Sequence, residues 1–141
     1  MSAWIPYAIV AALLYGLHQV FTKLAADRIG EGLGGFIVEA TATATIVVYL
    51  LYLRLAHQWN QASSAPGIWW SAATGFCVGI GTIAFFLLFQ RGGPLSAVPG
   101  IVAGGAAFTA VVGFLAFHEP MPISRIAGVL LSVLGLYLLR K

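Results

Sequence analysis

Charged side chains are scarce in this sequence of 141 residues, of which seven are Lys or Arg and four are Asp or Glu, or 8% in all. A soluble domain carries about 25% charged residues, so this chain has too little charge to cover a surface that faces water. The deficit excludes a soluble enzyme, a nucleic-acid-binding module and a disordered segment. Hydrophobic residues make up 60% of the chain. This composition indicates an integral membrane protein whose first partner is the lipid bilayer.

Cysteine occurs once, as Cys77, which excludes an internal disulfide and a cysteine-based metal site. The sequence also lacks a Ser or Cys nucleophile placed near a His on a recognisable elbow. It has no His, Cys and Asp cluster with metal-ligand spacing. The glycines of residues 75–81 lie inside an apolar run and form no phosphate-binding loop. We therefore expect no enzyme and no bound metal or cofactor, and the scattered basic residues predict no nucleic-acid partner.

Long apolar segments dominate what is present. A membrane-spanning helix needs about 20 mostly apolar residues, with a lower limit near 17. Five segments meet this requirement, over residues 4–24, 33–53, 67–90, 95–117 and 123–139, and the last is close to the minimum length. Polar turns that contain glycine or proline separate them. We predict an all-α integral membrane protein, a single domain over residues 1–141 with five transmembrane helices.

The basic residues predict how these helices are oriented. Five spans place the two termini on opposite sides of the membrane. The side of the N-terminus carries two basic residues, Arg54 and Arg125, and the other side carries five. Basic residues are enriched on the cytoplasmic side. The prediction is therefore a multi-pass protein with its N-terminus outside and its C-terminus inside.

The first span carries polar side chains on one face. Tyr15, His18, Gln19 and Thr22 follow helical spacing, and Lys23 lies at the edge of their face. A face of this kind cannot point at lipid, so it faces another helix or a water-filled cavity. Ionisable groups inside a spanning helix are costly, which makes them candidates for function.

Glu39, in the second span, is the other ionisable candidate. If the first two spans form an antiparallel hairpin, His18 and Glu39 lie at similar depth. A carboxylate beside an imidazole in a low-dielectric setting suits proton coupling, and Thr43 extends the polar lining by one turn. Three alternatives stay open. Glu39 pairs with Lys23 as a static ion pair, Glu39 lies near the headgroup layer, or His18 donates to a backbone carbonyl.

Small residues recur at helical spacing in the last three spans, where close packing replaces the hydrophobic driving force between helices. Gly75 and Gly79 lie four apart in the third span, and Gly128, Ser132 and Gly135 follow one another in the fifth. These rows of small residues, which we call seams, predict packing between helices of the chain or, on the fifth helix, a dimer face. Pro99 lies one turn into the fourth span and is expected to bend or loosen that helix.

Several of these segments together resemble the EamA-like module of the drug/metabolite transporter superfamily. Residues 85–99 are similar to that family's turn into its fourth helix, residues 117–120 to its glutamate after that helix, and residues 128–135 to its final helix. Members commonly combine two five-helix modules in inverted orientation. The resemblance implies that this chain is one half of an inverted-repeat ten-helix transporter fold. It would work as an antiparallel homodimer or as a heterodimer with an inverted paralogue.

The resemblance also implies a function. The expected protein is a secondary transporter subunit of a bacterial cytoplasmic (inner) membrane that exports a small organic metabolite or drug-like solute. Glu39, with His18, would carry the proton. The substrate cavity would be lined by Tyr15, His18, Gln19, Thr22, Thr43, Thr82 and Pro99. Glu39 is a departure, because many members carry an arginine nearby. The alternatives are a flippase for a lipid-linked substrate and a non-transporting scaffold or regulatory subunit.

Overall fold

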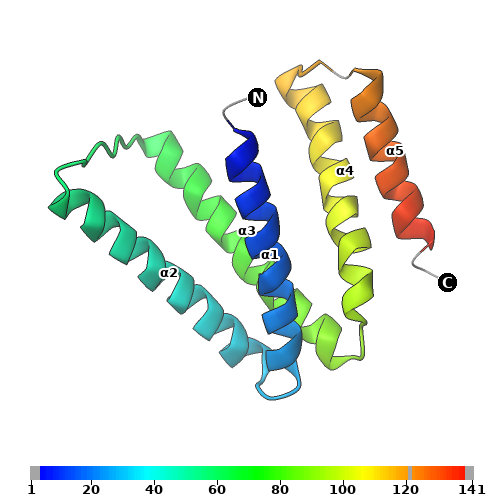
Figure 1. Cartoon of the computed structure of the whole chain (residues 1–141), viewed down its shortest axis with the longest axis horizontal. Helices are drawn as coiled ribbons and strands as arrows, with labels where there is room; N and C mark the ends of the chain where they lie inside the picture. The colour runs from blue at the N-terminus through cyan, green and yellow to red at the C-terminus, as the bar shows by residue number, and fades with distance from the viewer. Residues whose placement is uncertain (1–3, 121, 139–141) are drawn as a thin grey trace. The chain divides into compact units, whose positions relative to one another are not determined.

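The computed structural model describes residues 4–120 and 122–138, and this part of the chain is all-helical. It contains five α-helices and one 3₁₀ turn. Their bounds are α1 (Ile5–Ala26), α2 (Glu31–Leu55), α3 (Ala65–Gln90), η1 (Leu95–Ala97), α4 (Val98–Phe117) and α5 (Ile123–Leu138) (Figure 1). The all-α expectation is confirmed for these residues.

Four segments are long and apolar enough to cross a bilayer. They are α1, α2, α3 and the continuous stretch Leu95–Phe117, and the predicted spans agree with them to within two residues at each end. The fifth helix has 16 residues, fewer than a perpendicular crossing requires. The fold is therefore that of a multi-pass membrane protein with four candidate spans, and a fifth crossing stays a prediction. The expected end of the fifth span, residue 139, lies outside the described residues.

The chain divides between Gly92 and Gly93 into two compact units. The first unit holds α1, α2 and α3. The second unit holds η1, α4 and α5. Gly92 has a φ of +84°, a left-handed conformation that glycine adopts without steric cost, so the chain can turn sharply at this boundary.

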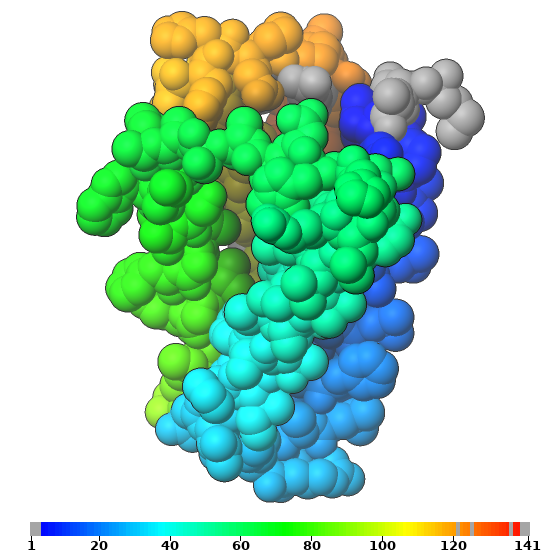
Figure 2. Space-filling view, turned by 90° about the vertical axis from the view of Figure 1, so that its left-hand side faces the viewer, coloured from blue at the N-terminus to red at the C-terminus, as the bar shows by residue number. Residues whose placement is uncertain are grey.

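The first unit is packed mainly at one end, and Leu53, near the end of α2, is its one buried residue elsewhere in the described part. Its other buried residues gather where α1 ends, α2 begins and α3 ends. There, Gln90 Nε2 of α3 donates to the carbonyl oxygen of Ile29 in the α1–α2 turn at 3.0 Å. Farther from that turn, α2 and α3 separate (Figure 2), and most of their side chains are exposed. The buried residues of this end are Gln19, Thr22, Ala26, Gly34, Gly35, Thr82, Phe86 and Phe89.

Glycine on α2 allows the close approach of α3. A Cβ atom at Gly34 would lie 2.5 Å from Cε1 of Phe86, whose side chain is 0% exposed. By contrast, Cβ atoms built at Gly75 and Gly79 meet nothing within 4 Å. The seam expected at Gly75 and Gly79 is thus not used for packing within the described residues, and the glycines that serve this purpose lie on the neighbouring helix.

The second unit is a hairpin of α4 and α5. His118 ends α4 in the left-handed conformation with a φ of 53°. The backbone N–H of Glu119 donates to the carbonyl oxygen of Gly113 at 3.1 Å. This bond satisfies a carbonyl that the end of a helix otherwise leaves open. The tight cap explains why the chain can reverse over the few residues that include Pro120.

Pro99 lies in the first turn of α4, which corrects the expectation that it bends a continuous span. The α-helix begins only at Val98, after the 3₁₀ turn η1. A first-turn residue has no intrahelical partner for its N–H, so proline removes no hydrogen bond there.

Replacement of Pro99 by Ala is therefore expected to lower the free energy of unfolding by less than about 1 kcal/mol. The matched change Ala106→Pro, in the middle of the same helix, is expected to cost about 3 kcal/mol or more. Denaturant unfolding of both variants in detergent, followed by circular dichroism, compares them. Equal losses would place Pro99 inside the helix rather than at its start.

Candidate functional site

Three polar residues of the first unit lie at one depth. His18 lies eight residues before the end of α1, Glu39 eight residues after the start of α2, and Thr82 eight residues before the end of α3. At a rise of 1.5 Å per residue, each is roughly 12 Å from its helix end. Since these three ends meet at the packed end of the unit, the three residues lie at one level, which we call the polar layer together with the neighbouring Gln19 and Thr22.

Glu39 is held by α3. Its Oε1 accepts a hydrogen bond from Oγ1 of Thr82 at 2.7 Å, and Thr82 is only 4% exposed. Gly35 lies beside this contact, and a Cβ built there would be in ordinary van der Waals contact with the Thr82 methyl group, at 3.9 Å. Hydrogen bonds between helices in lipid typically contribute about 0.6 kcal/mol and up to about 2 kcal/mol. The pair therefore fixes the carboxylate more than it stabilises the fold.

The α1 side of the layer has polar atoms without partners. Nδ1 of His18 and Oε1 of Gln19 are both buried and form no hydrogen bond within residues 4–120 and 122–138. The Thr22 hydroxyl, in contrast, donates to the carbonyl oxygen of His18 at 2.8 Å. The structure thus does not show the backbone bond expected as one alternative for the His18 ring.

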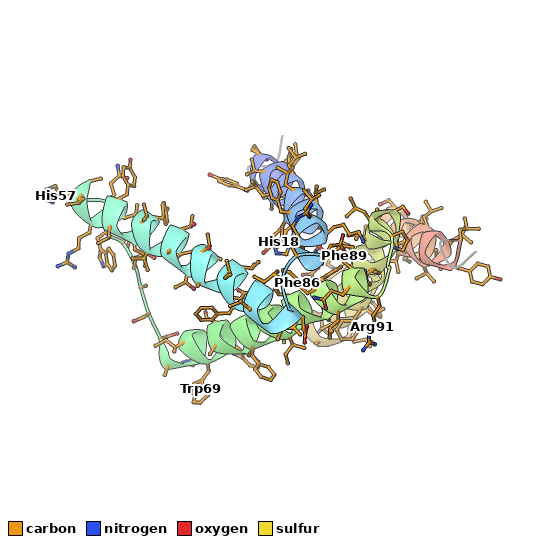
Figure 3. The ribbon with its side chains drawn as sticks, turned by 90° about the horizontal axis from the view of Figure 1, so that it is seen from below. His18, His57, Trp69, Phe86, Phe89 and Arg91 are labelled. Carbon is orange, nitrogen blue, oxygen red and sulfur yellow. The ribbon has the colours of Figure 1, made fainter. Side chains whose placement is uncertain are left out.

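Lys23 contacts an aromatic ring. Its Nζ lies 5.4 Å from the ring centroid of Phe89, a cation–π distance. In the described part of the chain, Glu39 forms neither an ion pair with Lys23 nor a hydrogen bond with His18, and its one bonded partner is Thr82. Figure 3 shows His18, Phe86 and Phe89 in the region where the three helices converge.

The remaining predicted cavity residues lie elsewhere. Tyr15 is 70% exposed, and Thr43 is exposed on α2. Pro99 belongs to the second unit. Five of the predicted residues therefore lie at or near the polar layer of the first unit, and Tyr15 and Thr43 are exposed on its surface. The five are His18, Gln19, Thr22, Glu39 and Thr82.

Sequence reasoning missed the aromatic part of the site. Phe86 and Phe89 are 0% and 1% exposed, and Phe89 also lies 6.2 Å from Phe85 between ring centroids. Nothing in a run of apolar residues distinguishes these rings from lipid-facing ones. The adjacent pair Gly34 and Gly35 was the available signal, because two small residues on one helix predict a bulky neighbour on the next.

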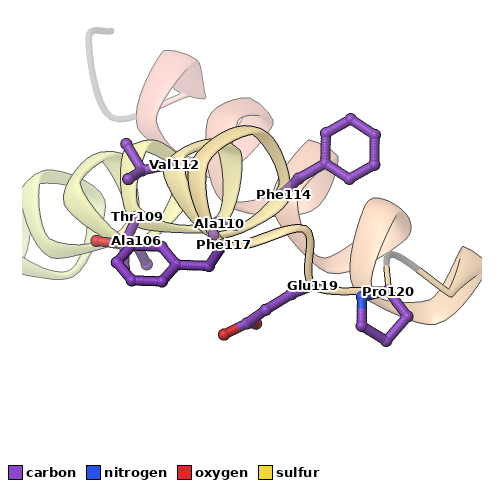
Figure 4. Close-up of a pocket in the computed structure, with 9 residues that line it drawn as sticks. Ala106, Thr109, Ala110, Val112, Phe114, Phe117, Glu119 and Pro120 are labelled. Carbon is purple, nitrogen blue, oxygen red and sulfur yellow. The ribbon is translucent and has the colours of Figure 1, made fainter.

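The second unit has a hollow of its own. It measures about 560 Å³ and lies along the last turns of α4, with Phe117, Glu119 and Pro120 at its rim (Figure 4). Oε2 of Glu119 would lie 3.6 Å from a Cβ at Gly113. The backbone of the same residue caps the end of α4.

Comparison with protein-family models, with curated proteins and with solved structures found no match to this chain. What the site can do is therefore argued from its own residues. Over the described residues, no group of three or more His, Cys, Asp or Glu side chains could hold a metal ion. The polar layer offers instead a carboxylate, an imidazole, an amide and a hydroxyl at the junction of three apolar helices.

Proposed function

We propose that the chain is a subunit of a proton-coupled secondary transporter that moves a small organic solute across a bacterial cytoplasmic membrane. The observation that supports this proposal most directly is the position of the Glu39 side chain between two apolar helices. Its Oε1 accepts a hydrogen bond from the Thr82 hydroxyl at 2.7 Å. Of the four acidic residues in the sequence, Glu39 alone lies deep inside a predicted span. An ionisable group inside a membrane span is costly, which makes it a candidate for an ion or proton pathway.

The subunit works as a dimer in this proposal. Large apolar side chains are exposed along every helix, for example Phe36, Phe76 and Phe108 at about 70%, and the first unit packs mainly at one end. Lipid covers some of this surface. The resemblance to an EamA-like module supports a second, inverted copy or an inverted paralogue that completes the cavity. Export and the orientation with the N-terminus outside belong to the same proposal.

Reconstitution tests the function. The purified full-length protein is placed in liposomes that contain a pH-sensitive dye, and primary amines, amino acids, sugars and organic anions are added outside in turn. At least one of these classes is expected to move protons about tenfold faster than it does in protein-free liposomes. If a folded, membrane-inserted protein moves protons with none of them, the scaffold or regulatory interpretation replaces the transporter.

Thr82 offers a graded test of the site. Thr82→Val removes the hydroxyl that holds Glu39 while it keeps the shape of the side chain, and Thr82→Ser restores the hydroxyl. We expect the coupled rate to fall about tenfold in Thr82→Val, because misplaced reacting groups lose rate steeply, and to recover to within about threefold in Thr82→Ser. Thr45→Val is the control, since that hydroxyl donates only to Thr41 of its own helix. Equal rates in Thr82→Val and wild type would show that the Thr82 hydroxyl is not needed for coupled transport.

A further inference from the structure

We propose that the polar layer of the first unit binds a primary ammonium group. The inference rests on the proposed transport function and names the class of solute that the site takes. Three acceptor atoms lack a donor among the described residues. They are Nδ1 of His18, Oε1 of Gln19 and the second carboxylate oxygen of Glu39.

Gln19 is buried, so the lack of a hydrogen-bond donor for its side-chain oxygen has an energetic cost. Gln19 is 9% exposed, and its Oε1 has no hydrogen-bond partner in the part of the chain that the structure describes. In a bilayer no bulk water is present to supply the missing donor. An ammonium group carries three N–H donors, and a neutral imidazole with its proton on Nε2 accepts at Nδ1. The number of donors thus equals the number of open acceptors.

The three acceptors lie at a similar depth in the first unit. Gln19 lies seven residues before the end of α1. Thr82, whose hydroxyl donates to Glu39, lies eight residues before the end of α3. The two levels differ by about 1.5 Å along the helix axes. His18 neighbours Gln19 in sequence and shares the level of Glu39. The three acceptors therefore lie at a similar level along the first unit rather than being spread over its length.

Lys23 shows that an ammonium group fits beside this layer. Its Nζ lies over the ring of Phe89 at 5.4 Å, one helical turn from Gln19. Phe89 and Phe86 are almost completely buried, so their faces lie in a low-dielectric setting where cation–π contacts are strongest. The chain thus already holds one primary ammonium at the aromatic edge of the site, and Glu39 has no cation as a partner within residues 4–120 and 122–138.

The same chemistry disfavours other occupants. A quaternary ammonium ion has the charge but no N–H group for the three acceptors. An anion meets the Glu39 carboxylate in low dielectric, where like charges repel strongly. A transition metal requires more nitrogen, sulfur or carboxylate ligands than the described residues bring together.

Equilibrium binding of radiolabelled methylammonium to the purified full-length protein in lipid nanodiscs tests the proposal. Binding is expected to be saturable. Propylammonium is expected to displace the bound methylammonium, and the same concentration of tetramethylammonium is expected to leave it bound. Gln19→Met, which keeps the length of the side chain, is expected to weaken binding about tenfold or more, because a hydrogen bond to a charged donor is lost. Gln61→Met, in the exposed α2–α3 loop, is the matched control and should bind like wild type.

Each contrary result overturns the inference. No saturable binding, equal displacement by tetramethylammonium, or unchanged binding by a folded Gln19→Met protein excludes a primary-ammonium site at these atoms. His18→Phe provides a second variant if Gln19→Met does not fold. The transport proposal fails separately: amine binding without any solute-coupled proton movement contradicts transport alone, and proton movement with a solute that is not an amine contradicts the ammonium site alone.

Discussion

Replacement of Gly34 by Val is expected to lower the free energy of unfolding by about 2 kcal/mol or more, the upper part of the range for an overpacked core. The added Cβ would lie 2.5 Å and 2.6 Å from two carbons of the Phe86 ring and 3.1 Å from a methyl group of Ile29. The ring is 0% exposed and has little room to move, so α2 and α3 must separate. Unfolding in a denaturing detergent, followed by helical circular dichroism, measures the loss.

Gly32→Val is the matched control. It adds the same β-branched side chain two residues earlier on α2, where a Cβ meets nothing within 4 Å. Both variants carry the same helix-propensity change, so the difference between them reports the contact with Phe86. We expect Gly32→Val to change stability by less than about 1 kcal/mol. Equal effects of the two substitutions would contradict the close packing of α2 on α3.

Replacement of Glu39 by Gln is expected to abolish solute-coupled proton movement, with a loss of at least about a hundredfold. The amide cannot release or take up a proton in the physiological range, yet its oxygen still accepts from the Thr82 hydroxyl, so the fold is retained. Dye-reported proton flux in liposomes measures the rate, and helical circular dichroism checks the fold. Glu31→Gln is the control, because Glu31 stands at the first position of α2. Retention of more than half of the wild-type flux would make Glu39 a structural residue.

The helices could be predicted from sequence because membrane length and apolarity act locally. The long apolar runs define the four candidate spans to within two residues, and the turns at residues 27–30 and 91–94 contain the polar and glycine residues that end a helix. The role of Pro99 was harder to predict. A short 3₁₀ turn before the helix moves its start to Val98, and no local pattern distinguishes a 3₁₀ turn from the first turn of an α-helix.

The candidate site could be predicted in part. Helical periodicity placed His18, Gln19 and Thr22 on one face of α1, and the hairpin count placed Glu39 at the level of His18. The partner of Glu39 could not be found in this way. Thr82 lies 43 residues farther along the chain, and which helix approaches Glu39 depends on the fit of Gly34 and Gly35 to the third helix rather than on any local pattern.

Infrared difference spectroscopy of the reconstituted protein tests the central claim that Glu39 exchanges a proton during the transport cycle. Spectra are recorded with and without a transported solute, for wild type and for Glu39→Gln. Solute addition to wild type is expected to change the balance between the carboxyl and carboxylate bands, and Glu39→Gln is expected to lack this change. A wild-type spectrum in which solute changes no carboxyl band, or a change that survives in Glu39→Gln, would contradict the assignment of the proton to Glu39.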